Sequence, residues 1–280
     1  MSYKKVGIVG YGYVGKAMTK FFENHYEVFV YDPCVENLEK GSKAKLASKD
    51  MLNTCDVGLV CVPTPHGKDG SCDTKIVEDT IDWLETPIIL IKSTVSIGTT
   101  DALKEKTGKR IVFSPEYCGE SSYWTPYEFH TEVKCTPFFT FGGDSKDTSC
   151  FVDLYMPVTG PTKTYRQTSA KAAEAAKYME NVFYATKILF CYEMSEIFDA
   201  MNIDYNEVRE LWLLDPRINP MHTSVFSSNK APFSGKCLPK DTNALVSSSR
   251  DANYDPKFIS EVLLSNKRIE EIRKKRDKEA

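Results

Sequence analysis

The chain has 280 residues, 41% hydrophobic and 27% charged, which excludes wholesale disorder and allows about two domains at roughly 150 residues each. A net charge of −3 argues against nucleic acid as a partner, and the longest apolar runs are too short to cross a membrane. Because the first strand-like run is not preceded by a signal-peptide pattern, we expect a cytoplasmic protein with no membrane partner.

The chain contains nine cysteines, an odd number, and they are scattered rather than set in a tight framework. Reduced thiols are therefore expected. There is no Cys-x-x-Cys pair, and the four histidines lie far apart in the sequence. This spacing predicts no metal site.

A glycine-rich turn follows the first expected strand, Lys5–Val9, and precedes a helical run over residues 16–22. The first glycine permits a tight turn, the second lets the backbone approach a pyrophosphate, and the third lets the helix pack closely. The helix N-terminus adds N–H groups for the phosphates, so the turn predicts a dinucleotide site. A purely structural turn is the alternative. The residues expected to contact the cofactor are Gly10, Gly12, Tyr13, Val14 and Gly15.

An acidic residue follows the second expected strand, Glu27–Tyr31. This residue, Asp32, lies 22 positions after Gly10, where a carboxylate can accept hydrogen bonds from the ribose hydroxyls of the adenosine. Its negative charge would repel a 2′-phosphate. The sequence therefore favours NAD over NADP as the cofactor.

Further apolar runs, over residues 57–62, 88–91 and 110–113, are expected to be strands that end in small polar residues or proline. In a parallel sheet the ligand lies beyond the carboxyl ends of the strands. Four polar residues are placed there, each with loop capping as its alternative role: Thr64, Thr94, Glu116 and Glu120. One more strand is expected at Phe138–Phe141.

An uninterrupted stretch from Ser169 to Met201, without proline or glycine, predicts one long helix. Lys177 and Asn181 are four residues apart and so share a face of this helix. A solvated surface pair is the alternative interpretation of these two residues.

The stretch from Ser234 to Asp241 contains a cysteine in an unusual setting. Gly235 allows backbone to crowd close to a ligand, and Lys236 and Lys240 would favour the thiolate form of Cys237. Asp241 is near enough to orient a water molecule or a side chain. The residues alone leave two readings of Cys237 open, a reactive cysteine and a buried structural thiol.

Taken together, the motifs resemble those of the UDP-glucose/GDP-mannose 6-dehydrogenase family over roughly residues 4 to 270. The resemblance rests on these pieces in order: residues 10–15, 62–64, 92–94, 113–116 with Glu120, Lys177 with Asn181, 215–218 and 235–242.

The resemblance implies an NAD-dependent, four-electron oxidation of the C6 alcohol of a nucleotide sugar, with UDP-glucose as the expected substrate. Cys237 would form a thiohemiacetal and then a thioester. Lys177 and Asn181 would act at the C6 oxygen and help to bind the sugar. The residues expected to assist the hydrolytic water or the acid–base steps are Asp241, Glu116, Glu120 and Thr94.

For the cofactor, the resemblance implies contacts from Thr64, Thr94, Glu120 and Lys240. For the substrate, it implies contacts from Glu116 and Gly235, with Arg217 reaching a phosphate across a homodimer built on the long helix.

The expected fold is α/β, with a Rossmann-type NAD-binding domain over residues 1–165 and a mostly α-helical central domain over residues 166–280. The family carries a third, UDP-binding domain, for which we expect no counterpart in these 280 residues.

Two alternatives remain at this point. A β-hydroxyacid or 6-phosphogluconate type dehydrogenase shares the dinucleotide domain and the long helix but performs a single oxidation without the cysteine motif. A non-catalytic NAD-binding protein would bind the cofactor without turning over a nucleotide sugar.

Overall fold

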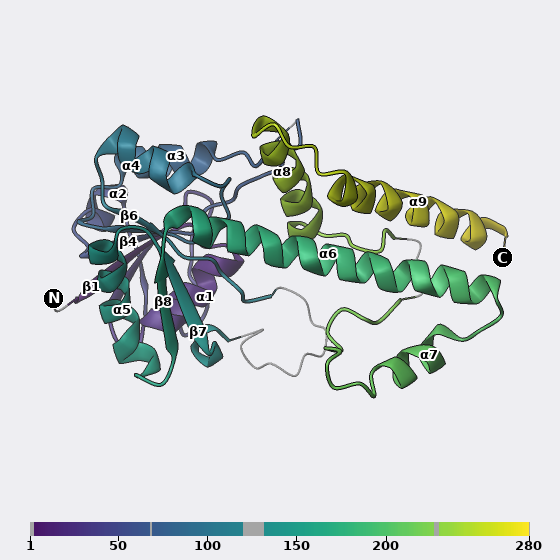
Figure 1. Cartoon of the computed structure of the whole chain (residues 1–280). Coiled ribbons are helices and arrows are strands. Elements are labelled where there is room, and N and C mark those ends of the chain that lie inside the picture. Colours follow the sequence, from purple (N-terminus) through teal and green to yellow (C-terminus); the bar gives the residue numbers. More distant parts are fainter. Residues whose placement is uncertain (1–2, 68, 120–131, 227–229, 280) are drawn as a thin grey trace. The chain divides into compact units, whose positions relative to one another are not determined.

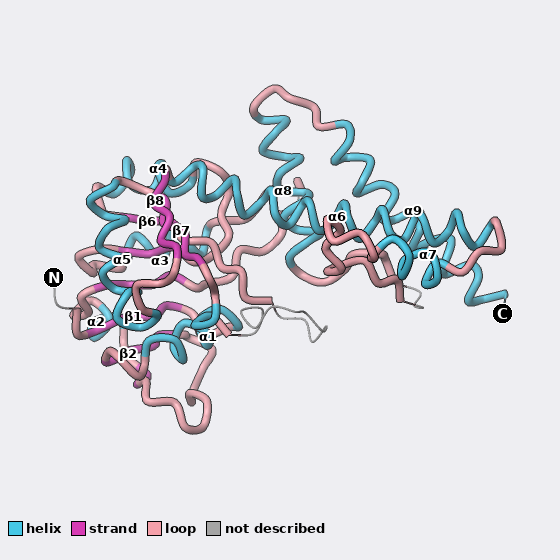
Figure 2. Tube along the Cα trace, turned by 60° about the horizontal axis from the view of Figure 1, so that its bottom comes forward, coloured by secondary structure: helices cyan, strands magenta, loops and turns pink. Residues whose placement is uncertain are grey.

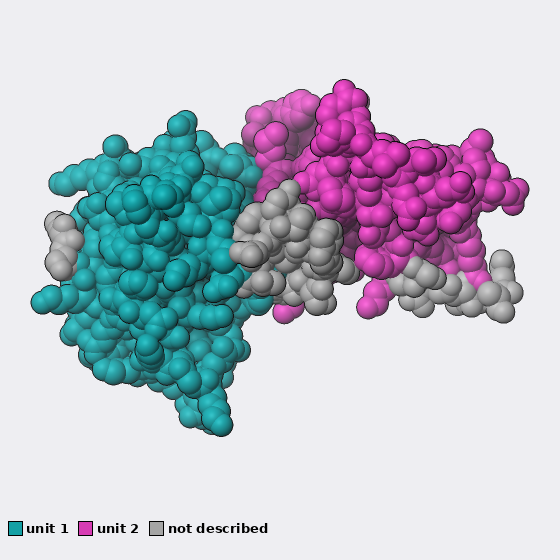
Figure 3. Space-filling model, turned by 90° about the horizontal axis from the view of Figure 1, so that it is seen from below, with its two compact units in different colours: residues 1–65, 73–177 teal, residues 66–72, 178–280 magenta. Residues whose placement is uncertain are grey.

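The computed structural model describes residues 3–67, 69–119, 132–226 and 230–279 (Figure 1). Packing divides the chain into two compact units, coloured separately in Figure 3. Unit 1 comprises Met1–Pro65 and Asp73–Lys177, and unit 2 comprises His66–Cys72 and Tyr178–Ala280. The short segment His66–Cys72, from the N-terminal half of the sequence, therefore packs with the C-terminal half.

Unit 1 is built on an eight-stranded sheet in the order β3-β2-β1-β4-β5-β6-β7-β8. The first six strands are parallel and have the strand order of a dinucleotide-binding fold. β7 runs antiparallel to β6, and β8 runs parallel to β7. The strands are β1 (Lys5–Val9), β2 (Glu27–Tyr31), β3 (Lys45–Leu46), β4 (Val57–Val60), β5 (Ile89–Ile91), β6 (Ile111–Phe113), β7 (Phe138–Gly142) and β8 (Thr164–Thr168).

Helices cover both faces of this sheet. Successive strand residues point to opposite faces, so neighbouring residues of one strand pack against different helices. Ile8 of β1 packs in the same cluster as Met18 of α1 and Leu154 of α5, whereas Val9 packs with Ile81 of α3 and Leu103 of α4. Near-continuous apolar strands are what a sheet buried on both faces requires. The helices of unit 1 are α1 (Tyr13–Phe22), α2 (Lys49–Leu52), α3 (Lys75–Trp83), α4 (Thr99–Thr107) and α5 (Ser145–Thr159), with a short 3-10 turn, η2 (Val133–Cys135).

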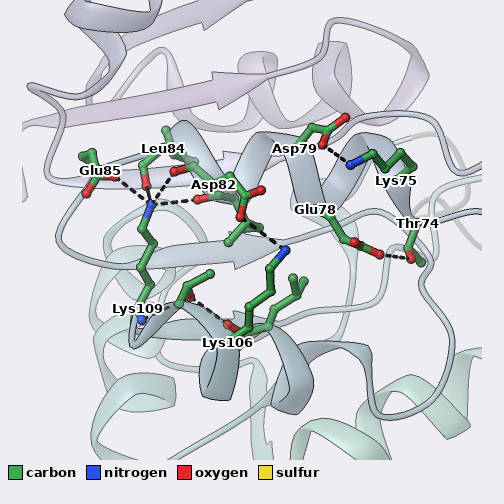
Figure 4. Close-up of polar contacts among 12 residues, drawn as sticks. Thr74, Lys75, Glu78, Asp79, Asp82, Leu84, Glu85, Lys106 and Lys109 are labelled. Atoms are coloured by element: carbon green, nitrogen blue, oxygen red, sulfur yellow. Dashed lines mark hydrogen bonds and ion pairs between the residues drawn. The ribbon is translucent and has the colours of Figure 1, made fainter.

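Charged side chains connect α3 with α4 and with the segment that precedes β6 (Figure 4). Lys109, which precedes β6, donates from Nζ to the carbonyl oxygens of Ile81, Asp82 and Leu84 at 2.8–3.1 Å. The same ammonium forms an ion pair with Glu85 at 2.8 Å. Lys109 therefore satisfies carbonyl groups that the end of α3 would otherwise leave without partners.

Unit 2 is helical, and the described strands all lie in unit 1 (Figure 2). Its core joins Leu189 and Tyr192 of the long helix to Phe233, Val262 and Ile269. Its helices are α6 (Ala170–Ala200), which starts in unit 1, α7 (Tyr205–Trp212), α8 (Cys237–Asp251) and α9 (Lys257–Glu279). This confirms the predicted fold class of a Rossmann-type sheet followed by helices built on one long helix.

None of the helices in the described ranges combines the length and the apolar run that a membrane span needs.

Candidate active site

The glycine turn lies between β1 and α1, next to the point where the strand order reverses. Gly10 has a φ of +92°, which disfavours any residue with a side chain. A Cβ at Gly15 would lie 2.0 Å from the carbonyl oxygen of Gly10, so only glycine lets α1 start this close to the turn. Around Gly12, by contrast, a Cβ would meet no atom of the described residues within 4 Å.

That open space at Gly12 is where the second glycine of a dinucleotide turn admits a pyrophosphate. The hydrogen bonding of α1 begins where Lys16 N–H donates to Gly12 O at 2.9 Å. The N–H groups of Val14 and Gly15 precede this bond and point out of the helix N-terminus. The turn thus fits a dinucleotide, with its packed glycines supporting the open one.

Asp32 follows β2 directly, as predicted, and the pairing of Val9 with Tyr31 sets it beside the glycine turn. Its carboxylate accepts hydrogen bonds from the N–H of Tyr11 at 2.7 Å and of Cys34 at 2.8 Å. These two bonds fix the carboxylate at the carboxyl edge of the sheet.

The loops after β4 and β5 are joined through two predicted residues, since Thr64 Oγ1 donates to the carbonyl oxygen of Thr94 at 2.8 Å. Tyr13, the first residue of α1, donates its hydroxyl hydrogen to the carbonyl oxygen of Gly119. The predicted residue Glu120 lies outside the described residues. The structure therefore brings the glycine turn and the loop after β6 together at one edge of the sheet.

Glu116 lies beyond the end of β6 and forms a buried ion pair with Lys92, which the sequence alone does not predict. Its Oε2 lies 3.2 Å from Nζ of Lys92, and the side chains are only 9% and 2% exposed. Its Oε1 accepts hydrogen bonds from the N–H groups of Tyr117 and Cys118, both at 2.9 Å. Burial alone would raise the pKa of Glu116, but the Lys92 charge and these donors hold it below its ordinary value.

Lys177 lies in the part of α6 that belongs to unit 1. Its Nζ is 5.0 Å from the ring centroid of Tyr117, a cation–π distance. Three residues earlier, the buried Glu174 accepts hydrogen bonds from the N–H groups of Gly98 and Thr100 at the start of α4. These bonds anchor the beginning of α6, and with it Lys177, to unit 1.

In unit 2, Asn181 and Asp241 are both buried and hydrogen-bonded to each other, Asn181 Nδ2 donating to Asp241 Oδ2. The other carboxylate oxygen of Asp241 pairs with Nζ of Lys240 at 2.6 Å. Lys240 Nζ also lies 4.0 Å from Sγ of Cys72, in the short segment that belongs with this unit. Asn181 is therefore part of a buried polar cluster, not of a solvated surface.

Cys237 is the first residue of α8, so the predicted loop is correct up to Lys236 and wrong from Cys237 onward, where the backbone is helical. The loop ends at Lys236, and the helix accommodates Pro239 because the first helical turn needs no N–H donor there. The thiol is exposed, which answers the buried-thiol alternative, and Asp241 follows one turn later. Gly235 has a φ of +87°, and a Cβ there would meet none of the described atoms within 4 Å, so the loop needs glycine for its backbone conformation.

Arg217 is exposed and bonds with Asp215, at 2.9 Å and 3.0 Å from Nε to the two carboxylate oxygens. The described structure thus gives Arg217 an intramolecular partner two residues away. The guanidinium holds the pKa of Asp215 below its ordinary value.

The fold and the glycine turn define a dinucleotide-binding α/β protein with a second, helical unit. Comparison with known proteins narrows this class. Residues 32–131 match the NAD binding domain of the UDP-glucose/GDP-mannose dehydrogenase family, and residues 171–268 match the central domain of that family. The chain belongs to this family and is classed with its NAD-dependent oxidoreductases, with NAD as the cofactor.

Among curated relatives, the chain is 26% identical to a UDP-glucose 6-dehydrogenase of Streptococcus pneumoniae, over 94% of this chain and 73% of that protein. It is also 26% identical to UDP-glucose 6-dehydrogenase TuaD of Bacillus subtilis, over 95% of this chain and 63% of that protein. The chain therefore spans about two thirds of the length of these relatives.

Among solved structures, a UDP-glucose dehydrogenase from Pyrobaculum islandicum has a TM-score of 0.79 at 23% identity, covering 97% of this chain and 68% of that one. A 3-hydroxyisobutyrate dehydrogenase from Mycobacterium tuberculosis has a TM-score of 0.68 at 16% identity, covering 94% and 92%. At these identities the likeness shows the fold alone.

Proposed function

We propose that the protein catalyses the NAD-dependent, four-electron oxidation of UDP-glucose to UDP-glucuronate through a covalent adduct on Cys237. The observation that supports this most is the start of α8. An exposed cysteine occupies the first position of the helix, where the N-terminus stabilises a thiolate. One turn later comes Asp241, a buried carboxylate held by Asn181 and Lys240.

In the first oxidation, Lys177 stabilises the alkoxide formed as the C6 hydroxyl loses its proton, and Asn181 positions that oxygen. NAD, when bound, accepts the hydride of each of the two oxidations. The Cys237 thiolate then adds to the aldehyde carbon to form a thiohemiacetal, whose oxidation leaves a thioester.

Hydrolysis completes the reaction. Water adds to the thioester carbonyl, the carbon–sulfur bond breaks, and Cys237 leaves as a thiolate while the C6 carboxylate is released. We assign the orientation of this water to Asp241 together with Thr94, Glu116 and Glu120. Overall, one alcohol, two NAD and one water give one carboxylate, two NADH and three protons.

For the cofactor, we assign the pyrophosphate to the turn from Gly10 to Gly15, with Tyr13 and Val14 at the helix N-terminus. Asp32 would accept hydrogen bonds from the ribose hydroxyls. Thr64, Thr94, Glu120 and Lys240 would complete the contacts, the last near the nicotinamide. The open space at Gly12 supports this assignment.

For the substrate, we assign Gly235 to the sugar pocket and Arg217 to a nucleotide phosphate in a homodimer. Along α6, within unit 2, large apolar side chains are 45–76% exposed at spacings of four and seven residues, which keeps them on one side of the helix. They are Met179, Phe183, Phe190 and Ile197. A row of exposed apolar side chains on one side of a helix is typical of a protein–protein interface, and we assign a second copy of this helix to cover it.

We further propose residues 1–165 as the cofactor domain and residues 166–280 as the central, dimer-forming domain. The two packing units instead meet at Lys177 and Tyr178, inside α6. The proposed domain boundary, at residue 165, separates the residues that serve the cofactor from the rest. The packing boundary lies later because the first residues of α6 belong to unit 1.

A single-step dehydrogenase acting on a β-hydroxyacid is the second candidate, because the likeness to 3-hydroxyisobutyrate dehydrogenase covers 92% of that chain. The cysteine motif argues against it, since a single oxidation to a carbonyl needs no covalent thiol.

The test is a panel of nucleotide sugars and β-hydroxyacids incubated with NAD, with the products identified by mass. The proposal predicts UDP-glucuronate from UDP-glucose. A carbonyl product from a β-hydroxyacid, with no nucleotide sugar oxidised, would favour the second candidate. NAD binding without turnover of any member would indicate a non-catalytic protein.

A further inference from the structure

The buried ion pair between Lys92 and Glu116 is fixed by the backbone of the sheet. Lys92 follows β5 and Glu116 lies three residues beyond β6, and these strands pair in parallel with Ile91 opposite Phe113. The backbone also holds Lys92 on its other side, where its N–H donates to Val60 O at 2.9 Å. Both side chains therefore start from the same carboxyl edge of the sheet as the glycine turn.

Three described donors contact the carboxylate of Glu116. Nζ of Lys92 approaches Oε2, and two backbone N–H groups approach Oε1. Lys92 Nζ is itself held by Ser114 Oγ at 3.3 Å and by the carbonyl oxygen of Pro115 at 3.1 Å. Two carboxylate oxygens offer about four acceptor positions. Donors from the described residues take three of them, which leaves one position on Oε2 for a further donor.

The other titratable groups facing this carboxylate, among the described residues, come from three elements. Cys61 follows β4, Cys118 lies in the loop after β6, and Tyr155 belongs to α5. Burial raises the pKa of all three, that of Cys61 to about 12, so each is neutral at pH 7. Lys92 supplies the positive charge that balances Glu116.

A purely structural purpose is a poor explanation for such a pair. Desolvating two charges costs about as much as their attraction returns, and well-packed apolar residues of similar volume are often as stable or more stable. A buried lysine and carboxylate at the ligand edge of a dinucleotide-binding sheet therefore favour a role in the chemistry.

We propose that Lys92 is a positioning residue that fixes Glu116 as a permanently ionised hydrogen-bond acceptor for the hydrolytic water or a substrate hydroxyl. The proposal rests on the proposed function and sharpens the role of Glu116, which acts as an acceptor throughout and not as a proton donor. Lys92 itself acts through Glu116.

The first test needs no activity and compares the free energy of unfolding of the full chain at pH 7 and pH 5. Without Lys92, desolvation raises the pKa of Glu116, so the Lys92→Met protein takes up a proton on Glu116 as the pH falls. The destabilisation caused by Lys92→Met should therefore shrink between pH 7 and pH 5. Lys109→Met is the matched control, because Lys109 mainly caps backbone carbonyls, which do not titrate, and its cost should stay constant.

The second test is the pH profile of kcat/KM with UDP-glucose and NAD. Lys92→Met should move the midpoint of the acid limb upward by about 1 to 3 pH units, the usual effect of a neighbouring opposite charge. The Lys109→Met profile should coincide with that of the unmodified protein. If the unmodified protein oxidises no nucleotide sugar, the proposed function fails, while the unfolding test still decides the role of Lys92.

An outcome in which Lys92→Met is equally destabilised at both pH values, or leaves the acid limb unmoved, would overturn the proposal. Should Lys92→Met fail to fold at pH 7, the double variant Lys92→Met/Glu116→Gln removes the uncompensated charge and is expected to fold. A double variant that folds no better than the single one would also contradict the proposal.

Discussion

Within the described parts of the chain, each unit has a lysine paired with a carboxylate that solvent barely reaches, and the two pairs are built differently. In unit 1, Lys92 and Glu116 are 3.2 Å apart, and backbone N–H groups supply the remaining donors. In unit 2, Lys240 and Asp241 are consecutive residues at the start of α8, 2.6 Å apart, and a side-chain amide from α6, that of Asn181, supplies the remaining donor.

This difference determines how many hydrogen-bond donors to each carboxylate a side-chain substitution can remove. Apart from Lys92, the donors to Glu116 are the main-chain N–H groups of Tyr117 and Cys118, which remain when those side chains are replaced. The donors of Asp241 are both side chains, and Lys240 is 14% exposed, so water can partly replace it. The first pair is therefore a rigid feature of the sheet, while the second depends on how α6 and α8 pack within unit 2.

The largest effect is expected next to the second pair, at Cys237. Cys237→Ser removes the nucleophile, so formation of UDP-glucuronate should fall by roughly a thousandfold or more, as in other enzymes that lose their nucleophile. The measurement is product mass after incubation with UDP-glucose and NAD. Cys135→Ser, at a cysteine in the 3-10 turn of unit 1, is the control and should leave turnover intact. Normal acid production by Cys237→Ser would remove the covalent role.

The two pairs themselves can be compared by removing each lysine. Lys92→Met should lower the free energy of unfolding by about 3 to 5 kcal/mol at pH 7, the usual cost of leaving a buried charge without its partner. Lys240→Met should cost less, because solvent reaches this site and Asn181 still donates to Asp241. Chemical denaturation at pH 7 measures both values, and equal costs would contradict the contrast between the pairs.

Asn181→Ala tests the dependence of the second pair on α6. Loss of a hydrogen bond to a buried carboxylate should cost about 1 to 3 kcal/mol of stability. Asn243→Ala is the matched variant, because that amide donates to a neutral acceptor, Pro239 O, at 2.7 Å. Asn243→Ala should lower the free energy of unfolding by less than Asn181→Ala, and the difference measures the contribution of the carboxylate charge. Equal losses of stability for the two variants would contradict such a contribution.

A third carboxylate extends the comparison, since Asp32 is held by two backbone N–H groups, as Glu116 is in part. Its negative charge should exclude the 2′-phosphate of NADP. Asp32→Asn should therefore narrow the ratio of kcat/KM for NAD over NADP by about tenfold, equivalent to 1.4 kcal/mol. Equal rates of the unmodified protein with both cofactors would dismiss Asp32 as the discriminator.

Much of unit 1 could be predicted because its strands are continuous apolar runs that end in turn residues. β1 and β2 have the predicted bounds, and the long helix differs by one residue at each end. The sequence did not reveal the start of α8, because Gly235 and Pro239 suggest a loop, whereas Pro239 lies in the first turn of the helix.

The candidate site was predictable where a residue acts through its position on one element, as with the glycine turn and Asp32. It was not predictable where two distant segments meet. Residues 92–94 form a recognisable motif, but the contact of Lys92 with Glu116 depends on the register of β5 with β6. The same holds for Asn181 and Asp241, which are 60 residues apart and meet only through the packing of α6 and α8.

The most direct test of the proposed reaction is the number of NADH molecules formed for each molecule of UDP-glucose consumed. NADH absorbance and remaining nucleotide sugar are measured in the same reaction at completion. The covalent cysteine mechanism predicts two NADH for each UDP-glucose, with UDP-glucuronate as the product. A yield of one NADH with an aldehyde or ketone product would contradict it.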